Sequence, residues 1–227
     1  MRWILAIVMV ALPVLALAQE APALKTEKEK LSYAMGMDLG GQLKAQSVDI
    51  DPALFAEGLK AALAGAKTLM TDAEAKAVIS KLQMARVAKQ AAEAKVVGDK
   101  NKAEGDAFLA ANKAKEGVVT LASGVQYKVL SRGTGKQPTI DDTVVCQYRG
   151  TLIDGKEFDS SYKRGQPATF AVKGVIKGWT EVLQLMPVGS KWQVIIPPAL
   201  AYGERGAGAD IGPNATLIFE IELVAIK

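Results

Sequence analysis

The sequence contains no histidine and only one cysteine, Cys146, among its 227 residues. The absence of histidine removes the usual general base, the commonest metal ligand and every Ser-His or Cys-His nucleophile pair. A single cysteine excludes an internal disulfide and a cysteine-rich metal site, so we expect no metal and no other cofactor. Cys146 stands in an apolar run, where a small core residue is a more frequent role than a nucleophile. Catalysis by this chain must therefore work without the common proton-transfer and metal machinery.

Strong charge asymmetry is also missing. The net charge is +4, but the 28 basic residues are spread among 24 acidic ones. No basic block of the kind that follows a phosphate backbone stands out, so we expect no nucleic-acid partner. Apolar residues make up 49% and charged residues 23%, which is an ordinary globular balance. The length allows one large domain or two small ones, with a sizeable core in either case.

The first 18 residues have the features of a secretory signal. Arg2 supplies the positive start, an apolar stretch follows to Leu17, and residues 16–18 form an A-x-A cleavage site. The stretch is shorter than a membrane span of about 20 residues, although a retained anchor is the alternative. We expect a cleaved signal, a mature protein that begins at Gln19, and a periplasmic location, with outer-membrane association left open. We expect no permanent membrane anchor.

Helical signals dominate from about residue 26 to residue 113. Thr26 with Glu29 forms a capping-box pattern, and Asp51 followed by Pro52 is typical of a helix start. These signals predict three helices, at 27–45, 52–64 and 72–113.

The third predicted helix is long, about 60 Å at ~1.5 Å per residue. Its second half consists mainly of Ala, Lys and Glu, so we expect it to bridge domains through solvent. Gly98 and Gly105 would weaken this helix and allow it to bend.

The first two predicted helices carry apolar stripes at helical spacing. Their members are Leu31, Met35 and Leu39 in one helix and Leu54, Phe55, Leu59 and Leu63 in the other. Two short helices bury little surface alone, so they need a partner. The partner could be the start of the long helix, a second chain, or both. We favour a homodimer through these helices, with a small intramolecular bundle as the alternative.

Beyond Gly117 the pattern changes to strands. Apolar, aromatic and β-branched residues alternate or cluster near 125–129, 144–148, 168–172, 192–196 and 217–226, and only 178–185 has a helical pattern. The fold class is therefore α+β: a helical N-terminal dimerisation domain, a long connecting helix, and an antiparallel sheet with one short helix. We expect a signal peptide at 1–18, the dimerisation domain at 19–70, the connecting helix at 71–116 and the sheet domain at 117–227.

Six stretches of the sheet domain resemble the FKBP-type peptidyl-prolyl cis-trans isomerases. They are VCQYRGTL (145–152), GKEFDSS (155–161), GVIKGW (174–179), MPVGS (186–190), PPALAYG (197–203) and IGPNATLIFEIEL (211–223). LSYAMGMDLG (31–40), the long helix and SGVQYKV (123–129) are similar to the macrophage infectivity potentiator (Mip) branch of that family. The resemblance covers nearly the whole mature chain. It implies a bent antiparallel sheet wrapped around a short helix, and a dimer whose long helices hold two catalytic domains apart.

The resemblance also assigns a pocket. It implies that Trp179 lies at the floor, that Asp159 and Tyr202 are its polar groups, and that the Ile176 N–H donates to the bound ligand. It implies apolar walls and rim residues at Tyr148, Phe158, Val175, Phe219 and Ile211, and a basic residue near Asp159 at Arg164. Ala168 and Ala207 depart from the best-known small members, which commonly have an aromatic residue and a histidine there. Both departures bear on substrate preference and inhibitor strength.

Such a pocket would act on proline-containing polypeptide clients. An apolar cavity favours a twisted, less polar amide over the planar one, and this catalysis needs no nucleophile, base or metal. The alternative is a periplasmic dimeric chaperone that binds unfolded clients, with isomerase activity secondary. The resemblance also implies a site for macrolide inhibitors.

Overall fold

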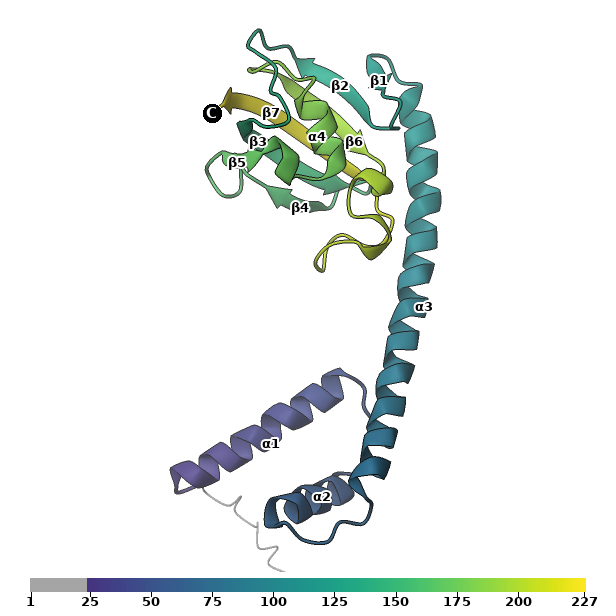
Figure 1. Ribbon diagram of the computed structural model, residues 1–227, viewed down its shortest axis with the longest axis vertical. Helices are drawn as coiled ribbons and strands as arrows, with labels where there is room; N and C mark the ends of the chain where they lie inside the picture. Colours follow the sequence, from purple (N-terminus) through teal and green to yellow (C-terminus); the bar gives the residue numbers. More distant parts are fainter. Residues whose placement is uncertain (1–23) are drawn as a thin grey trace, which may run out of the picture. The chain divides into compact units, whose positions relative to one another are not determined.

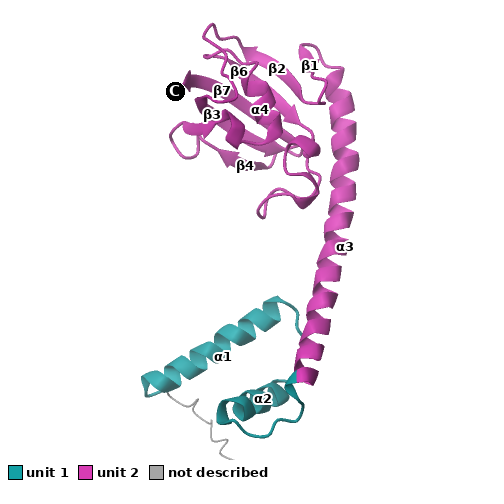
Figure 2. Ribbon diagram, viewed as in Figure 1, with its two compact units in different colours: residues 1–72 teal, residues 73–227 magenta. Residues whose placement is uncertain are grey.

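The computed structural model describes residues 24–227 (Figure 1). The predicted signal peptide at 1–18 lies outside the described residues. The chain divides into two compact units, the first ending at Asp72 and the second spanning Ala73–Lys227 (Figure 2). From residue 24 onward, no helix has the length and hydropathy that crossing a bilayer requires.

The first unit contains α1 (Glu27–Ala45) and α2 (Pro52–Ala64), which begin where the capping signals predicted. The Thr26 hydroxyl accepts from the Glu29 N–H at 3.2 Å, and the Glu29 carboxylate accepts from the Thr26 N–H at 2.8 Å. The Asp51 carboxylate accepts from the Ala53 N–H at 2.8 Å, ahead of Pro52 in the first turn of α2. Both starts thus satisfy backbone donors that have no partner within the helix.

The apolar stripes of α1 and α2 are not covered within the first unit. In the ranges Glu27–Ala45 and Pro52–Ala64 the structure buries no residue. Leu31 and Met35 are 63% and 64% exposed, and Leu63 is 81% exposed. Large contiguous apolar patches are unusual on the surface of a monomeric protein.

The long helix α3 (Asp72–Lys113) has the predicted bounds, but the expectation that it only bridges through solvent is wrong for its C-terminal part. Gly98, Gly105 and Asn112 are its buried residues, and all three face the sheet domain. Gly98 and Gly105 have a packing role that the sequence did not predict, while the expectation that they let the helix bend stays a prediction. They carry no side chain because residues 213–216 pack directly against the helix there.

The sheet of the second unit has seven antiparallel strands in the order β1-β2-β6-β7-β3-β4, with β5 paired to β3. They are β1 (Val118–Thr120), β2 (Gln126–Ser131), β3 (Thr143–Leu152), β4 (Glu157–Ser160), β5 (Ala168–Ala171), β6 (Lys191–Ile196) and β7 (Leu217–Ile226). One short helix, α4 (Lys177–Leu183), lies across one face of the sheet (Figure 1). Short 3₁₀ turns at Val172–Gly174, Pro198–Leu200 and Gly203–Arg205 complete the unit. The predicted α+β class is confirmed.

The core of this unit lies between the sheet and α4. Alternate residues of β7 point inward, so Leu217, Ile221 and Leu223 are fully buried. Val182 and Leu183 of α4 meet them from the other side. Tyr148, Phe158, Phe170 and Phe219 gather with Trp179 at one side of this core, around the first turn of α4, and that is where the candidate site forms.

Candidate active site

Trp179 is the centre of a cage of aromatic rings. It lies in the first turn of α4 and is 4% exposed. The ring centroids of Tyr148, Phe170 and Phe219 lie 5.2, 5.5 and 5.3 Å from its own, all edge-to-face. Edge-to-face contacts place the positive ring edge against a negative ring face, so the cage holds its geometry.

Gly178 permits this position of the indole. A Cβ at residue 178 would lie 2.5 Å from the Ile196 side chain, so only glycine lets α4 approach β6 this closely. The first turn of α4, and Trp179 with it, therefore lies directly on the sheet.

A cavity of about 680 Å³ opens above the indole. The sequence-predicted residues Tyr148, Phe158, Asp159, Val175, Ile176, Trp179, Tyr202, Ile211 and Phe219 all line it. Arg164 does not line it but contacts two residues that do. The wall is mainly aromatic and aliphatic, so water inside it finds few hydrogen-bond partners. Space of this volume is sufficient for a ligand of a few residues.

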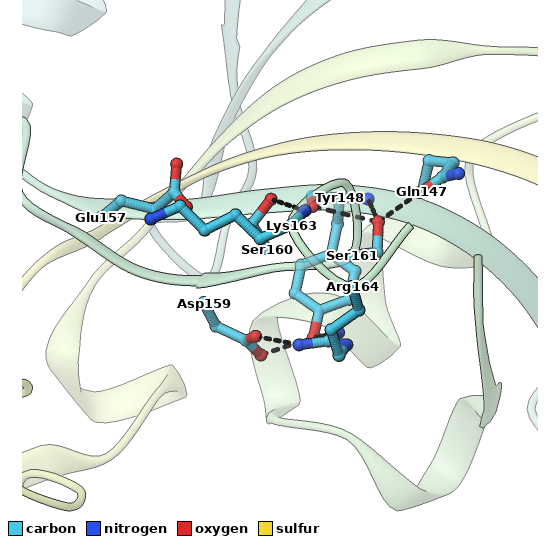
Figure 3. A network of polar contacts seen from close by, with 8 residues as sticks. All are labelled: Gln147, Tyr148, Glu157, Asp159, Ser160, Ser161, Lys163 and Arg164. Atoms are coloured by element: carbon cyan, nitrogen blue, oxygen red, sulfur yellow. Dashed lines mark hydrogen bonds and ion pairs between the residues drawn. The ribbon is translucent and has the colours of Figure 1, made fainter. Parts of the chain in front are cut away.

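One corner of the cavity is polar, because Asp159 and Tyr148 line it. Figure 3 shows the contacts around these two residues. The Asp159 carboxylate accepts hydrogen bonds from the Tyr148 hydroxyl and from the Arg164 guanidinium. Arg164 also donates to the Tyr148 oxygen, at 2.6 Å. The three groups form a closed triangle, which fixes the Tyr148 ring that closes one side of the cage.

The same contacts keep Asp159 ionised. Partial burial would raise the pKa of its carboxyl, but the hydrogen bonds from Tyr148 and Arg164 and the charge of Arg164 outweigh burial and hold that pKa below its usual range. Burial, with the Asp159 hydrogen bond second, raises the pKa of the Tyr148 phenol. Both groups therefore keep one protonation state around neutral pH, which suits an electrostatic role and not proton transfer.

Ser161 does not line the cavity but supports the backbone of Tyr148 (Figure 3). Its hydroxyl accepts from the Tyr148 N–H at 2.8 Å, and its own N–H donates to the Tyr148 carbonyl at 2.9 Å. The hydroxyl also donates to the Gln147 side chain. Because Ser161 is fully buried, these bonds fix the backbone of β3 against the loop that follows β4.

Ala207, named in the sequence as a departure from the family, also lines the cavity, and sequence reasoning missed Phe170, Gly174 and residues 208–210, which line it as well. Phe170 lies on the same face of β5 as Ala168 and contacts both Tyr148 and Trp179. The two-residue period of β5 could have shown in the sequence that Phe170 shares the inward face of the strand. Ala168 packs against the core, and the ring two residues later supplies an aromatic wall.

Within residues 24–227 no group of three or more potential ligands is placed to hold a metal ion. Burial raises the pKa of the Cys146 thiol to about 12, so it stays protonated.

Comparison with known proteins adds the family. The family model described as FKBP-type peptidyl-prolyl cis-trans isomerase matches residues 134–224, and the model of the domain amino terminal to it matches residues 28–129. The peptidyl-prolyl cis-trans isomerase Mip of Coxiella burnetii is 46% identical over 226 residues, which cover 100% of this chain and 98% of the relative. The chain belongs to the FKBP-type peptidyl-prolyl cis-trans isomerases.

Other FKBP-type relatives agree. The outer membrane protein MIP of Legionella longbeachae is 52% identical over 210 residues, which cover 92% of this chain and 90% of the relative. The crystal structure of FkpA from Escherichia coli matches with a TM-score of 0.66 and 37% identity, over 90% of this chain and 99% of that chain. The resemblance predicted from the sequence is therefore confirmed, and it extends to both units of the FKBP-type chain.

Proposed function

We propose that this FKBP-type isomerase acts by holding the twisted X-Pro amide in the aromatic cavity. Rotation about a peptide bond costs ~18–20 kcal/mol because it breaks amide resonance. Resonance places negative charge on oxygen, and water stabilises that charge separation. A cavity walled mainly by Trp179, Phe158 and Phe219 offers little such solvation, so it favours the less polar twisted amide. The cavity over the indole is the observation that carries this proposal.

The roles of individual residues follow from their positions. Trp179, Phe158, Tyr148 and Phe219 receive the proline ring. The Ile176 N–H and the Tyr202 hydroxyl hold the peptide backbone, while Val175 and Ile211 close the rim. All of these residues line the same cavity.

Asp159 orients the site as a fixed negative charge. Both of its oxygens already accept hydrogen bonds, so it is poorly placed to take a proton from substrate. Its charge instead fixes Tyr148 and Arg164 and lies beside the carbonyl that rotates. If Asp159→Ala kept full kcat/KM, this role would be wrong.

The decisive experiment is a protease-free isomerase assay on the full chain. Phe158→Ala should lower kcat/KM more than tenfold, the equivalent of over ~1.4 kcal/mol of transition-state stabilisation. Tyr162→Ala is a matched control, because Tyr162 is an aromatic residue of the adjoining turn that is 45% exposed and does not line the cavity. An unchanged rate for Phe158→Ala would argue against the cavity as the site.

In this proposal the N-terminal helices form a homodimer, with the dimerisation domain at 19–70, the connecting helix at 71–116 and the isomerase domain at 117–227. The uncovered stripes on α1 and α2 support it, because a second copy would cover them. Export through a cleaved signal, to the periplasm or the outer membrane, is supported by the composition of residues 1–18 and by the printed name of the Legionella relative. Macrolide inhibitors would occupy the same cavity as substrate.

The same exposed side chains keep a chaperone function as the second candidate. Leu54, Leu59 and Leu63 of α2 are 50–81% exposed and would suit an unfolded client as well as a second copy. Phe158→Ala separates the two candidates. If it abolishes acceleration of proline-limited refolding but still suppresses client aggregation, the chain has both functions. If suppression is lost as well, the cavity alone accounts for the activity.

A further inference from the structure

Three residues of α3 form a stripe that faces the sheet domain. Gly98, Gly105 and Asn112 are its buried residues, each seven positions after the last. Seven residues make about two helical turns, so the stripe runs along one face. The helix from Ala73 onward belongs to the same compact unit as the sheet (Figure 2).

The two glycines bring the helix backbone against the segment 213–216. A Cβ at Gly98 would lie 3.2 Å from Pro213 Cβ and from Asn214 Nδ2. A Cβ at Gly105 would lie 2.4 Å from Thr216 Oγ1, closer than any real side chain tolerates. This segment therefore has no room to move toward the helix.

Asn101 lies between the two glycines on the same face and adds a specific bond. Its Nδ2 donates to the Pro213 carbonyl at 2.8 Å. The contact joins residues that are 112 positions apart in the sequence, and Asn101 is partly buried. A hydrogen bond that is partly shielded from water is directional, and leaving its donor or acceptor unpaired costs free energy.

The segment that Asn101 holds is the base of one cavity wall. Immediately before it, Ala207 and Ile211 pair across a short hairpin, with N–H to O distances of 2.8 and 3.1 Å. Residues 207–211 all line the cavity. The hairpin tip is tied by Asp210 to Lys156 at 2.8 Å, but both side chains are more than half exposed. An exposed ion pair of this kind contributes little, so the base governs where the wall lies.

We propose that Asn101 is a positioning residue of the isomerase: through the Pro213 carbonyl it sets the position of the hairpin 207–211, and so the affinity for the chain that flanks the proline. This inference rests on the proposed function of the cavity. The long helix then does more than connect, since its side chain adjusts a wall of the site. Asn101 touches no substrate, so it should act on KM more than on kcat.

The test uses the full chain with Asn101→Asp, which has nearly the same shape but places an oxygen where the donor was. Lys102→Ala is the control, because its side chain is 63% exposed one position along the helix. Hydrogen exchange of the Ala207 and Ile211 amides and the separate values of kcat and KM are measured. We expect about tenfold faster exchange at these amides and about a fivefold higher KM, with kcat changed less than twofold.

A second pair of variants guards against a trivial loss of folding. Gly105→Ala should push Thr216 and disturb the same amides, and Gly105→Ala with Thr216→Ala should restore their exchange because the second change removes the nearest atom. Exchange and KM that match the control in Asn101→Asp would overturn the inference, as would a fall in kcat at constant KM. A third outcome is also informative: Asn101→Asp speeds hairpin exchange, but variants of the cavity residues do not change the isomerase rate. This outcome would support the positioning of the hairpin by Asn101 and would count only against the proposed function of the cavity.

Discussion

The two compact units differ in whether their apolar side chains are buried or exposed. Leu183 in α4 is fully buried, whereas Leu63 in α2 is 81% exposed, although both lie on short amphipathic helices. The second unit closes a core between α4 and its sheet. Short helices without tertiary packing are marginal in water, so α1 and α2 need another surface. The second unit therefore covers its own apolar residues, whereas the first unit leaves exposed the stripes on which the proposed homodimer rests.

The largest expected effect tests that homodimer. Leu31→Glu together with Met35→Glu places two charges on the α1 stripe, where a dimer of this chain would bury four. We expect a cost of more than about 6 kcal/mol, enough to leave a monomer in sedimentation equilibrium. The unfolding transition of the second unit should not change.

Lys30→Gln together with Lys44→Gln is the matched control for this test. It shifts the net charge of each chain by the same amount at positions on the opposite side of α1. The control should remain dimeric. A dimeric Leu31→Glu, Met35→Glu chain would show that the stripe is not the interface.

The next largest effect lies in the second unit. Leu183→Ala should cost about 2–5 kcal/mol, because the packed core around a fully buried leucine relaxes only partly. Leu185→Ala, two residues further and 38% exposed, should cost much less. Chemical unfolding followed by tryptophan fluorescence gives both values. They should not depend on protein concentration; a clear dependence would mean that the second unit also relies on a partner.

The parts that the sequence predicted well have local causes. The starts of α1 and α2 follow from hydrogen bonds made by residues within four positions of each other, at Thr26 and Asp51. The alternation of β7 likewise reports its buried face directly. Such signals are complete within a short window, so no partner segment is needed to interpret them.

The parts that the sequence did not predict depend on distant partners. A glycine in a helix looks the same in the sequence whether or not another segment lies against it. The close approach of Thr216 to Gly105 is visible only in the folded chain. Phe170 was visible as an apolar strand residue, but its place in the cage depends on Trp179 and Tyr148. The cavity residues Phe158 and Trp179 came from resemblance, since composition alone leaves each a packing residue.

A smaller effect tests how α3 joins the rest of the second unit. The Asn112 amide donates to Gln126 at 2.8 Å, Gln126 donates to the Leu109 carbonyl at 2.9 Å, and both side chains are buried. Asn112→Ala should cost about 1–3 kcal/mol, because it leaves a buried Gln126 acceptor unmatched. Adding Gln126→Ala should cost less than the sum of the single changes. Lys113→Ala is the control. Additive losses would mean that the two amides act independently.

The smallest expected effect is that of pH on kcat/KM, which should stay nearly constant around neutral pH. The partners of Asp159 lower its pKa in the folded protein. The stability that its charge contributes is therefore complete above the pKa of the unfolded chain, ~3.9, and is lost only as pH falls through the lower pKa of the folded protein. The pKa of Tyr148 is raised, and the chain has no histidine. We therefore expect kcat/KM, measured by NMR exchange on a proline peptide, to vary less than twofold from about pH 5 to about pH 9. Phe158→Ala should lower the whole profile without adding a slope. A limb near pH 6–7 would reveal a titrating group in the reaction and would contradict catalysis by a cavity that moves no proton.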